Sequence, residues 1–271
     1  MPRSSIHYQI WGDVGQFDNR KAVVETVFYY LAFVLVTGAI FATLISRLLI
    51  LFHVFDYLGW AAIAGFGFSA LVAAFVGFRA ASNGTKGLEL QRVDIEKAPS
   101  LMNLTEGLCL TIGIEMPRVF ELNEQQINIG AFSVGNTRSV LVVTTGAINA
   151  FSRLEFEAMI ARELVRTRSG QIFFEARVRA LQRLLAPLAA FIVPRRQSAL
   201  ITSRLVAGDL GGVFITRYPI AMISALEKME QDAKSRSYGA NLRRRVLAPY
   251  WAHPELEDAG MDARLSELRT F

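Results

Sequence analysis

The stretch LVVTTGAINAFSRLEFEAMIARELVR, residues 141–166, changes its periodicity halfway and so sets the fold class. Residues 139–144 are mostly aliphatic and β-branched, which predicts a buried strand that runs into a turn. After the turn, apolar residues recur at helical spacing, and Ser152 and Glu155 are placed as a capping box. We expect much of the buried helix face to come from Leu154, Ala158, Ala161 and Val165. A strand followed by such a helix predicts an α+β domain.

Two long apolar runs precede this domain. Residues 26–46 and 57–78 contain no charged side chain, and each is long enough to cross a hydrocarbon core of about 30 Å as a helix. Core helices of a soluble domain normally show a polar stripe, which is missing here, and the first run is too long for a signal peptide. The short connector between the runs predicts an antiparallel transmembrane hairpin.

Charge indicates how this hairpin is oriented. Basic residues lie before the first run and after the second, whereas the connector offers only Arg47. The positive-inside rule then places both termini in the cytoplasm, in a multi-pass protein of the inner (plasma) membrane. We expect a cytoplasmic amino-terminal arm over residues 1–25, the hairpin over 26–79 and a cytoplasmic domain over 80–271.

The composition indicates which kinds of partner and which cellular compartment to expect. The chain has 271 residues and a net charge of +5, and its basic runs suit the anionic leaflet of a lipid bilayer better than nucleic acid, which we do not expect as a partner. A single cysteine, Cys109, excludes an internal disulfide and fits a reducing compartment.

Small residues recur at every fourth position of the second apolar run. This helix-association stripe consists of Ala61, Gly65, Ser69, Ala73 and Gly77. Small side chains allow helices to approach closely in a membrane. The stripe can be filled by the first helix of the hairpin or by a partner, and membrane helices are rich in alanine and glycine in any case.

Further elements are predicted around the central strand and helix. We expect a helix with Leu101, Leu104, Leu108 and Ile112 on its buried face, a strand at residues 117–123, a helix over about 219–235 and a short helix near 262–268. The basic segment 171–200 has an apolar centre that is too short to span a membrane, so it is either interfacial or packed.

Four blocks of the chain resemble the M48 family of membrane zinc peptidases, in particular its HtpX-like group. MPRVFELNEQQINIGAFSVG, residues 116–135, resembles the strand and substrate-side segment of the family, and residues 141–166 resemble the strand, turn and helix that deliver its H-E-x-x-H motif. SRLVAGDLGGVFITRYPIAMISALEKME, residues 203–230, and HPELEDAGMDARLSEL, residues 253–268, follow in the family's order. The resemblance implies a mostly helical zincin domain with a small β-sheet.

The residues that bind zinc in that family are replaced here. In H-E-x-x-H, histidines at i and i+4 bind one Zn²⁺ and the glutamate activates a metal-bound water. The histidine positions hold Arg162 and Arg166, and the third ligand position, four residues before Asp209, holds Leu205. None of these side chains has a lone pair to offer a metal, so we expect no zinc cofactor and only a vestigial base at Glu163. A family asparagine on the substrate side is also replaced, by Gly130.

The two arginines return the positive charge that Zn²⁺ would supply. We expect Glu163 to accept from Arg162, Arg166 or a neighbour such as Arg204, with Arg166, at i+3, as the better partner on the same helix. Arg162 should instead reach Asp209 or a backbone carbonyl. The alternatives are that Glu163 serves a metal-free reaction, or that the charges have drifted onto a solvated face.

Three functions stay open at this point. The first is a catalytically inactive protein that binds, scaffolds or regulates a complex of membrane proteins. The second is an active zinc endopeptidase in membrane-protein quality control, with ligands outside the motif. The third is a structural subunit that acts through its transmembrane hairpin. The sequence names neither the partner nor the oligomeric state.

Overall fold

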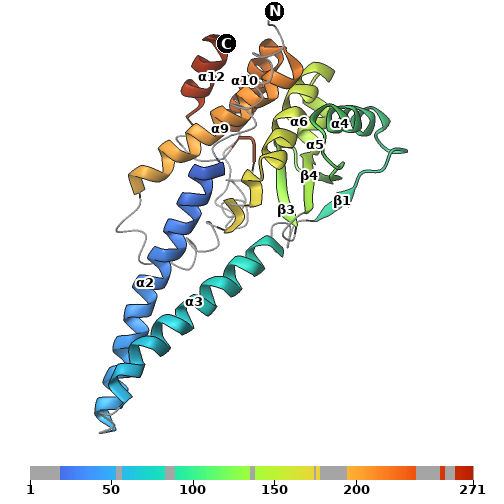
Figure 1. Cartoon of the computed structure of the whole chain (residues 1–271). Coiled ribbons are helices and arrows are strands. Elements are labelled where there is room, and N and C mark those ends of the chain that lie inside the picture. Colours follow the sequence, from blue (N-terminus) through green and yellow to red (C-terminus); the bar gives the residue numbers. More distant parts are fainter. Residues whose placement is uncertain are drawn as a thin grey trace, which may run out of the picture.

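The computed structural model describes residues 19–52, 57–82, 89–134, 138–173, 175–177, 194–235, 251–253 and 260–270. Most of the predicted arm, residues 83–88 and the centre of the basic segment 171–200 lie outside these ranges. The described chain is an α+β protein in which two long helices project from a part that holds four strands and the other helices (Figure 1). The predicted fold class is therefore confirmed.

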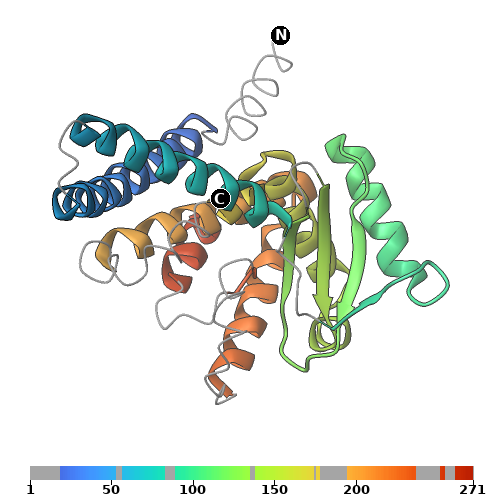
Figure 2. The ribbon, with the colours of Figure 1, turned by 90° about the horizontal axis from the view of Figure 1, so that it is seen from below.

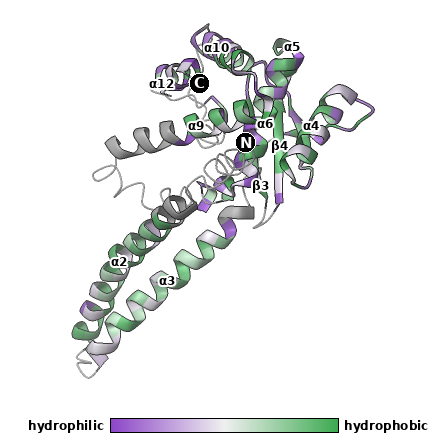
Figure 3. Ribbon diagram, turned by 45° about the horizontal axis from the view of Figure 1, so that its top comes forward, coloured by the Kyte–Doolittle hydropathy of each residue, from purple (hydrophilic) through white to green (hydrophobic). Residues whose placement is uncertain are grey.

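The projecting hairpin is built from α2 (Asn19–Leu51) and α3 (Leu58–Ser82). With 33 residues, α2 is about 50 Å long, and it begins inside the segment predicted as the arm. Two spans, Val27–Leu51 and Gly59–Arg79, are long and apolar enough to cross a membrane, and Figure 3 shows both helices coloured mostly as hydrophobic. Only a minor share of each span is buried. Both outer ends of the hairpin lie on the side of the strands (Figure 1), as an antiparallel hairpin requires.

The helix-association stripe lies between the two helices of the hairpin. All five of its residues are buried, and a Cβ added to Gly65 would lie only 2.5 Å from the backbone nitrogen of Ala42. Gly77 lies in the same way against Tyr30. The first helix therefore fills the stripe within the chain, and the exposed apolar side chains of α2 and α3 point elsewhere.

The four strands form one mixed sheet in the order β1-β2-β4-β3. β1 (Leu90–Arg92) is antiparallel to β2 (Arg118–Leu122), β2 is parallel to β4 (Arg138–Thr144), and β3 (Ile129–Val134) is antiparallel to β4. β4 is central because it is a run of aliphatic residues that is buried on both faces. The predicted strands at 117–123 and 139–144 are confirmed, whereas β1 and β3 were not predicted. In Figure 2 the hairpin and helix α4 lie on opposite flanks of the strands.

Two hydrophobic clusters use the two faces of the sheet. Leu141 and Val143 of β4 join the larger cluster with helices α4 (Pro99–Ile112), α6 (Arg153–Arg168), α10 (Pro219–Ser235) and α12 (Met261–Thr270). Val140 and Val142 point to the opposite face and pack with Phe132 and Trp251. The short helix α5 (Thr145–Ala150) occupies the predicted turn, and α9 (Pro194–Thr216) crosses α6.

Helix α6 begins as the sequence predicts. The Ser152 hydroxyl accepts a hydrogen bond from the Glu155 amide, and the Glu155 carboxylate accepts one from the Ser152 amide. Ala158, Ala161 and Val165 are buried as expected, but Leu154 is 51% exposed. Leu154 was assigned wrongly because it lies in the first turn, before α6 becomes covered on all sides by its neighbours. From Ala158 to Arg166 every residue is buried.

Candidate functional site

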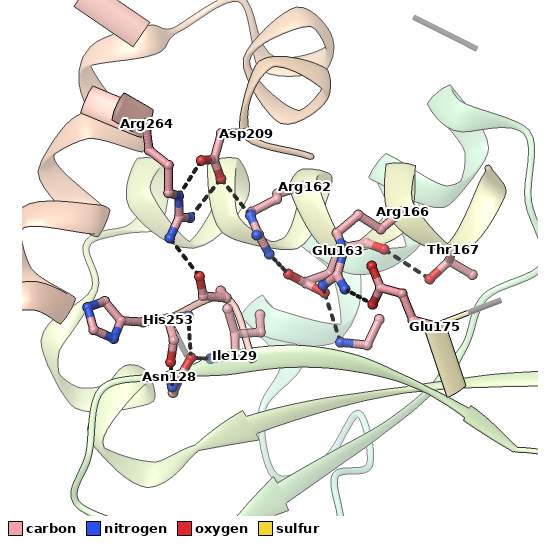
Figure 4. A network of polar contacts seen from close by, with 12 residues as sticks. Asn128, Ile129, Arg162, Glu163, Arg166, Thr167, Glu175, Asp209, His253 and Arg264 are labelled. Carbon is pink, nitrogen blue, oxygen red and sulfur yellow. Dashed lines mark hydrogen bonds and ion pairs between the residues drawn. The ribbon is translucent and has the colours of Figure 1, made fainter. Parts of the chain in front are cut away.

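The candidate site lies where α6 and α9 pack against each other beside β3 and α12 (Figure 4). Glycines on α9 permit this close packing. A Cβ added to Gly211 would lie 2.7 Å from Val165, and one added to Gly212 would lie 3.0 Å from the backbone nitrogen of Arg162. The charged side chains of the two helices are thereby held in a space without solvent.

Arg162 lies in the centre of this space and is fully buried. Its Nε donates to Asp209 Oδ1 at 2.6 Å, which confirms the partner predicted from the sequence. Its Nη1 also donates to Glu163 Oε1, although neighbouring helix positions diverge and Arg166 was expected to be the better partner. The explanation is the length of the arginine, which lets one guanidinium reach α9 and still contact the carboxylate beside it.

Arg166 lies one turn after Arg162 on α6, and it is 2% exposed. Its Nη1 donates to Glu163 Oε2 at 2.7 Å, the i+3 pairing predicted from the sequence. Its Nη2 donates to Glu175 Oε2 at 3.0 Å. Arg166 therefore ties α6 to the segment that follows it.

Both carboxylate oxygens of Glu163 are engaged. Oε1 accepts from Arg162, and Oε2 accepts from Arg166 and from the Ala131 amide of β3 at 2.9 Å. The predicted supporting residue Gly130 is the neighbour of Ala131 on that strand. The side chain is fully buried, so no water reaches it from solvent. A carboxylate in this setting is a structural acceptor, since both of its oxygens already accept from donors and three hydrogen bonds stabilise its charged form.

A third cation, Arg264 of α12, completes the cluster. Its Nε and Nη2 bind the two oxygens of Asp209 at 2.6 and 2.9 Å, and its Nη1 donates to the Ala252 carbonyl at 2.9 Å. The sequence analysis missed this residue, although an arginine in the closing element of the related family was a usable signal. Glu175 was also missed, and no sequence pattern pointed to it.

The six groups balance in charge. Arg162, Arg166 and Arg264 face Glu163, Glu175 and Asp209, and all of them are buried. Burial alone would raise the pKa of Asp209, but Arg264 and Arg162 outweigh it and hold that pKa below its usual value. Burial opposes the charge of Arg166 as well, yet Glu163 and Glu175 raise its pKa. For Arg162 burial prevails and lowers the pKa, although an arginine stays protonated at any physiological pH.

The residues at the positions where the resemblance implies zinc ligands do not fit a zinc ion. Guanidinium groups only donate hydrogen bonds, and Leu205 is a buried hydrocarbon on α9. Within the described ranges, no three His, Cys, Asp or Glu side chains are grouped as metal ligands would be. His253 is buried nearby, and burial together with the charge of Arg264 lowers its pKa to about 4.

A second charged network lies at the other end of α6. Glu155 accepts hydrogen bonds from Lys228 at 2.7 Å and from Ser224 at 2.5 Å, both on α10, in addition to its capping bond. Burial raises the pKa of Glu155, but these donors, Lys228 foremost, bring it down to about 2. This network is open to solvent, because the Lys228 side chain is 40% exposed.

A groove of about 820 Å³ separates α4 from the α5–α6 junction. Leu104, Leu108, Phe151 and Phe156 are among its lining residues. It shares no residue with the charge cluster, so it is a separate feature of the surface.

Comparison with known proteins identifies the relatives of the chain. It is 30% identical over 177 residues to a protein named protease HtpX homolog from Salinibacter ruber, and 26% identical over 169 residues to one of the same name from Dictyoglomus thermophilum. Both relatives are named as homologues of the HtpX proteases of the M48 family, and this chain is similar to them over about half of its length. The two alignments cover 56% and 51% of this chain, and 63% and 56% of the relatives.

Other comparisons add little to the HtpX relationship. No family model matches the chain. The crystal structure of Ste24p from S. mikatae superimposes with a TM-score of 0.40 and 12% identity, covering 92% of this chain and 66% of that one. At that TM-score the likeness is too loose to compare individual residues. The charge cluster therefore has to be judged from its own geometry.

Proposed function

We propose that this HtpX homologue is catalytically silent and serves as a binding, scaffolding or regulatory subunit of a membrane protein complex. One observation carries the proposal. The three positions that would hold zinc are occupied by Arg162, Arg166 and Leu205, and both arginines are committed to buried carboxylates. The cluster supplies the positive charge that the carboxylates need, and it offers no site for a metal-bound water.

The state of Glu163 supports the same proposal. To act as a base, this carboxylate would have to accept a proton in competition with Arg162, Arg166 and the Ala131 amide, and protonation would weaken its ion pairs. Breaking a buried ion pair costs about 3–5 kcal/mol, because it leaves an unpaired charge without solvent. The cluster is therefore stable as a structural element and unsuited to proton transfer.

The hairpin gives this subunit its place in the cell. We propose that α2 and α3 anchor it in the inner (plasma) membrane with both termini in the cytoplasm, since basic residues flank the outer ends of the hairpin. The stripe is filled within the chain, so partner helices would contact the exposed outer faces of α2 and α3. Protease protection of tagged termini in sealed vesicles tests the orientation, and a terminus on the outer side refutes it.

Zinc content is the decisive test of catalytic silence. We expect protein purified without chelator to carry far less than one zinc per chain, and about one zinc per chain would overturn the proposal. The double variant Arg162→His with Arg166→His should still lack zinc and proteolysis, because Leu205 provides no third ligand. The triple variant that adds Leu205→Glu is the matched comparison, since it alone restores three groups with lone pairs.

Partner capture separates a scaffold from a purely structural hairpin. Tagged full-length chain is isolated from native membranes in parallel with a variant in which Asp209→Leu disrupts the cluster. A regulatory or scaffolding role predicts membrane proteins that copurify with the first and are lost with the second. Equal recovery with both chains would assign the contact to the hairpin.

A further inference from the structure

The groove between α4 and the α5–α6 junction is separate from the charge cluster, and apolar side chains make up much of its surface. Its volume is about 820 Å³, and it is bordered by one face of α4 and by the residues that lead into α6. Leu104 and Ile148 both line it and are only partly buried. Apolar side chains that stay in contact with water on a concave surface are typical of a place where another molecule binds.

Exposed leucines border the groove on both sides. Leu110 of α4 follows the lining residue Gly107 by one helical turn, and Leu154 of α6 precedes the lining residue Glu157 by the same spacing. Leu110 is 79% exposed, which exceeds the value for every large apolar side chain described in the hairpin. The apolar surface therefore extends from the groove over both of its rims.

Gly107 lies inside α4 and lines the groove. Glycine is unfavourable in the interior of a helix. Gly211 and Gly212 of α9 are explained by their close contact with α6, but a Cβ added to Gly107 would have no atom of the described chain within 4 Å. Packing within the described chain therefore does not require this glycine, whereas a second helix that approaches the backbone of α4 closely would require it.

The wall that α6 contributes to the groove carries one charge of each sign. Arg153 and Glu157 both line the groove, one helical turn apart. With the base before the acid, their order is the less favourable one for an ion pair within a helix. In the part of the chain that the structure describes, neither side chain makes a hydrogen bond or an ion pair. Both charges are thus available to an acid and a base that lie one turn apart on an opposing helix.

We infer that this groove binds an amphipathic helix of a partner protein, which lays a row of apolar side chains between α4 and α6 and pairs an acidic residue with Arg153 and a basic residue with Glu157. The inference rests on the proposed function, because it assigns the surface through which a non-catalytic subunit holds its partner. With 14 residues, α4 is about 20 Å long, so a partner helix of similar length covers it. In Figure 2, α4 lies on the flank of the strands opposite to the hairpin, which indicates a partner helix outside the membrane.

Binding of a designed helical peptide tests the groove. The probe has about 15 residues, leucines at helical spacing, and one glutamate and one lysine a turn apart. Fluorescence anisotropy measures its binding to the full-length protein in phosphatidylcholine nanodiscs, where no detergent competes for the groove, and empty nanodiscs give the background.

A pair of leucine substitutions on α4 provides the variant and its control. We expect Gly107→Leu to weaken binding at least about tenfold, because the new side chain fills the groove. It should not lower the melting temperature, since a side chain at this position meets open space. Glu106→Leu, at an exposed position that does not line the groove, should bind the peptide as the native chain does.

Exchange of charge tests the chemistry of the partner. A second peptide has lysine in place of the glutamate, and it should bind the native chain about fivefold more weakly, because one lysine then faces Arg153. Arg153→Glu should reverse this preference, since both wall charges are then negative. The fold tolerates this substitution, because an acid in the first turn of α6 is favourable.

Several outcomes would overturn the inference. They are no binding of either peptide to the native chain, equal binding to Gly107→Leu, and an unchanged preference in Arg153→Glu. Self-association that Gly107→Leu abolishes would assign the groove to a second copy of the chain, and binding of a fluorescent fatty acid without either peptide would assign it to lipid. A chain that holds zinc and cleaves substrates would refute the proposed function without altering these affinities, so the two failures are distinguishable.

Discussion

The two ends of helix α6 hold charge in different surroundings. At its beginning, Glu155 meets one lysine that is partly exposed to water. Further along, three arginines and three carboxylates are sealed from solvent and each needs at least one partner of opposite sign. The comparison teaches that water can complete the first network when a partner is lost, whereas only protein groups can complete the second.

Removal of Asp209 should give the largest effect, because this carboxylate serves two buried arginines. We expect Asp209→Leu to lower the free energy of unfolding by about 3–5 kcal/mol, measured by chemical denaturation in detergent. Asp262→Leu, at an exposed position of α12, is the control and should cost less than about 0.5 kcal/mol. Similar losses for both variants would show that the cluster is not sealed from water.

His253 should make the free energy of unfolding depend on pH, because its ring is buried beside the charge cluster. Its pKa is lowered from 6.5 to about 4, so the unfolded chain takes up a proton that the folded chain refuses. The stability linked to the neutral ring is complete above pH 6.5 and should fall, by up to about 3 kcal/mol, as the pH drops from 6.5 to 4. His253→Asn should remove this slope when unfolding is followed across that range. An unchanged slope would assign the acid sensitivity to other groups.

Glu155→Gln probes the open end of the helix. The substitution weakens a cap and the bond to Lys228, so we expect a loss of about 1–2 kcal/mol at neutral pH. The pKa of Glu155 is lowered from 4.5 to about 2, and the advantage of the native chain should therefore vanish as the pH falls through that interval. Denaturation of both chains between pH 5 and 2 measures it, and a constant difference would contradict the assignment.

Disruption of a surface ion pair should give the smallest loss of stability among these variants. Arg269 and Glu227 are 3.2 Å apart, with side chains that are 63% and 43% exposed. We expect Arg269→Ala to change the free energy of unfolding by less than about 0.5 kcal/mol, because water replaces the lost contact. If Arg269→Ala destabilised the protein as much as Glu155→Gln, solvent exposure would not determine how much an ion pair contributes to stability.

Features that depend on local sequence were predictable. The capping box at Ser152 and Glu155, the bounds of α10 and the i+3 contact of Arg166 with Glu163 all follow from spacing along one helix. The partner of Arg162 was predictable as well, because the family resemblance placed Asp209 on the facing helix.

Features that depend on contacts between distant segments could not be predicted from the sequence. Arg264 binds Asp209, which lies 55 positions earlier in the sequence. Gly130 of β3 likewise pairs with Trp251, which is far from it in the sequence. Leu154 was assigned to the core because its position fits the helical spacing of the apolar residues. The spacing does not indicate where the neighbouring helices end, and Leu154 is in fact exposed. These contacts are decided by packing, which a periodicity cannot report.

Because the arginines share carboxylates, a metal site could not be introduced here by one substitution. Arg162→His alone would take a donor from both Asp209 and Glu163, and Arg166→His alone would take one from Glu163 and Glu175, while Leu205 would still deny a metal its third ligand. Each of these substitutions removes a donor from the buried carboxylates, although Asp209 keeps Arg264 and Glu163 keeps one arginine, and none of them alone completes a metal site. Several substitutions would have to be made together before an ion could bind, because no single one of them supplies three ligands.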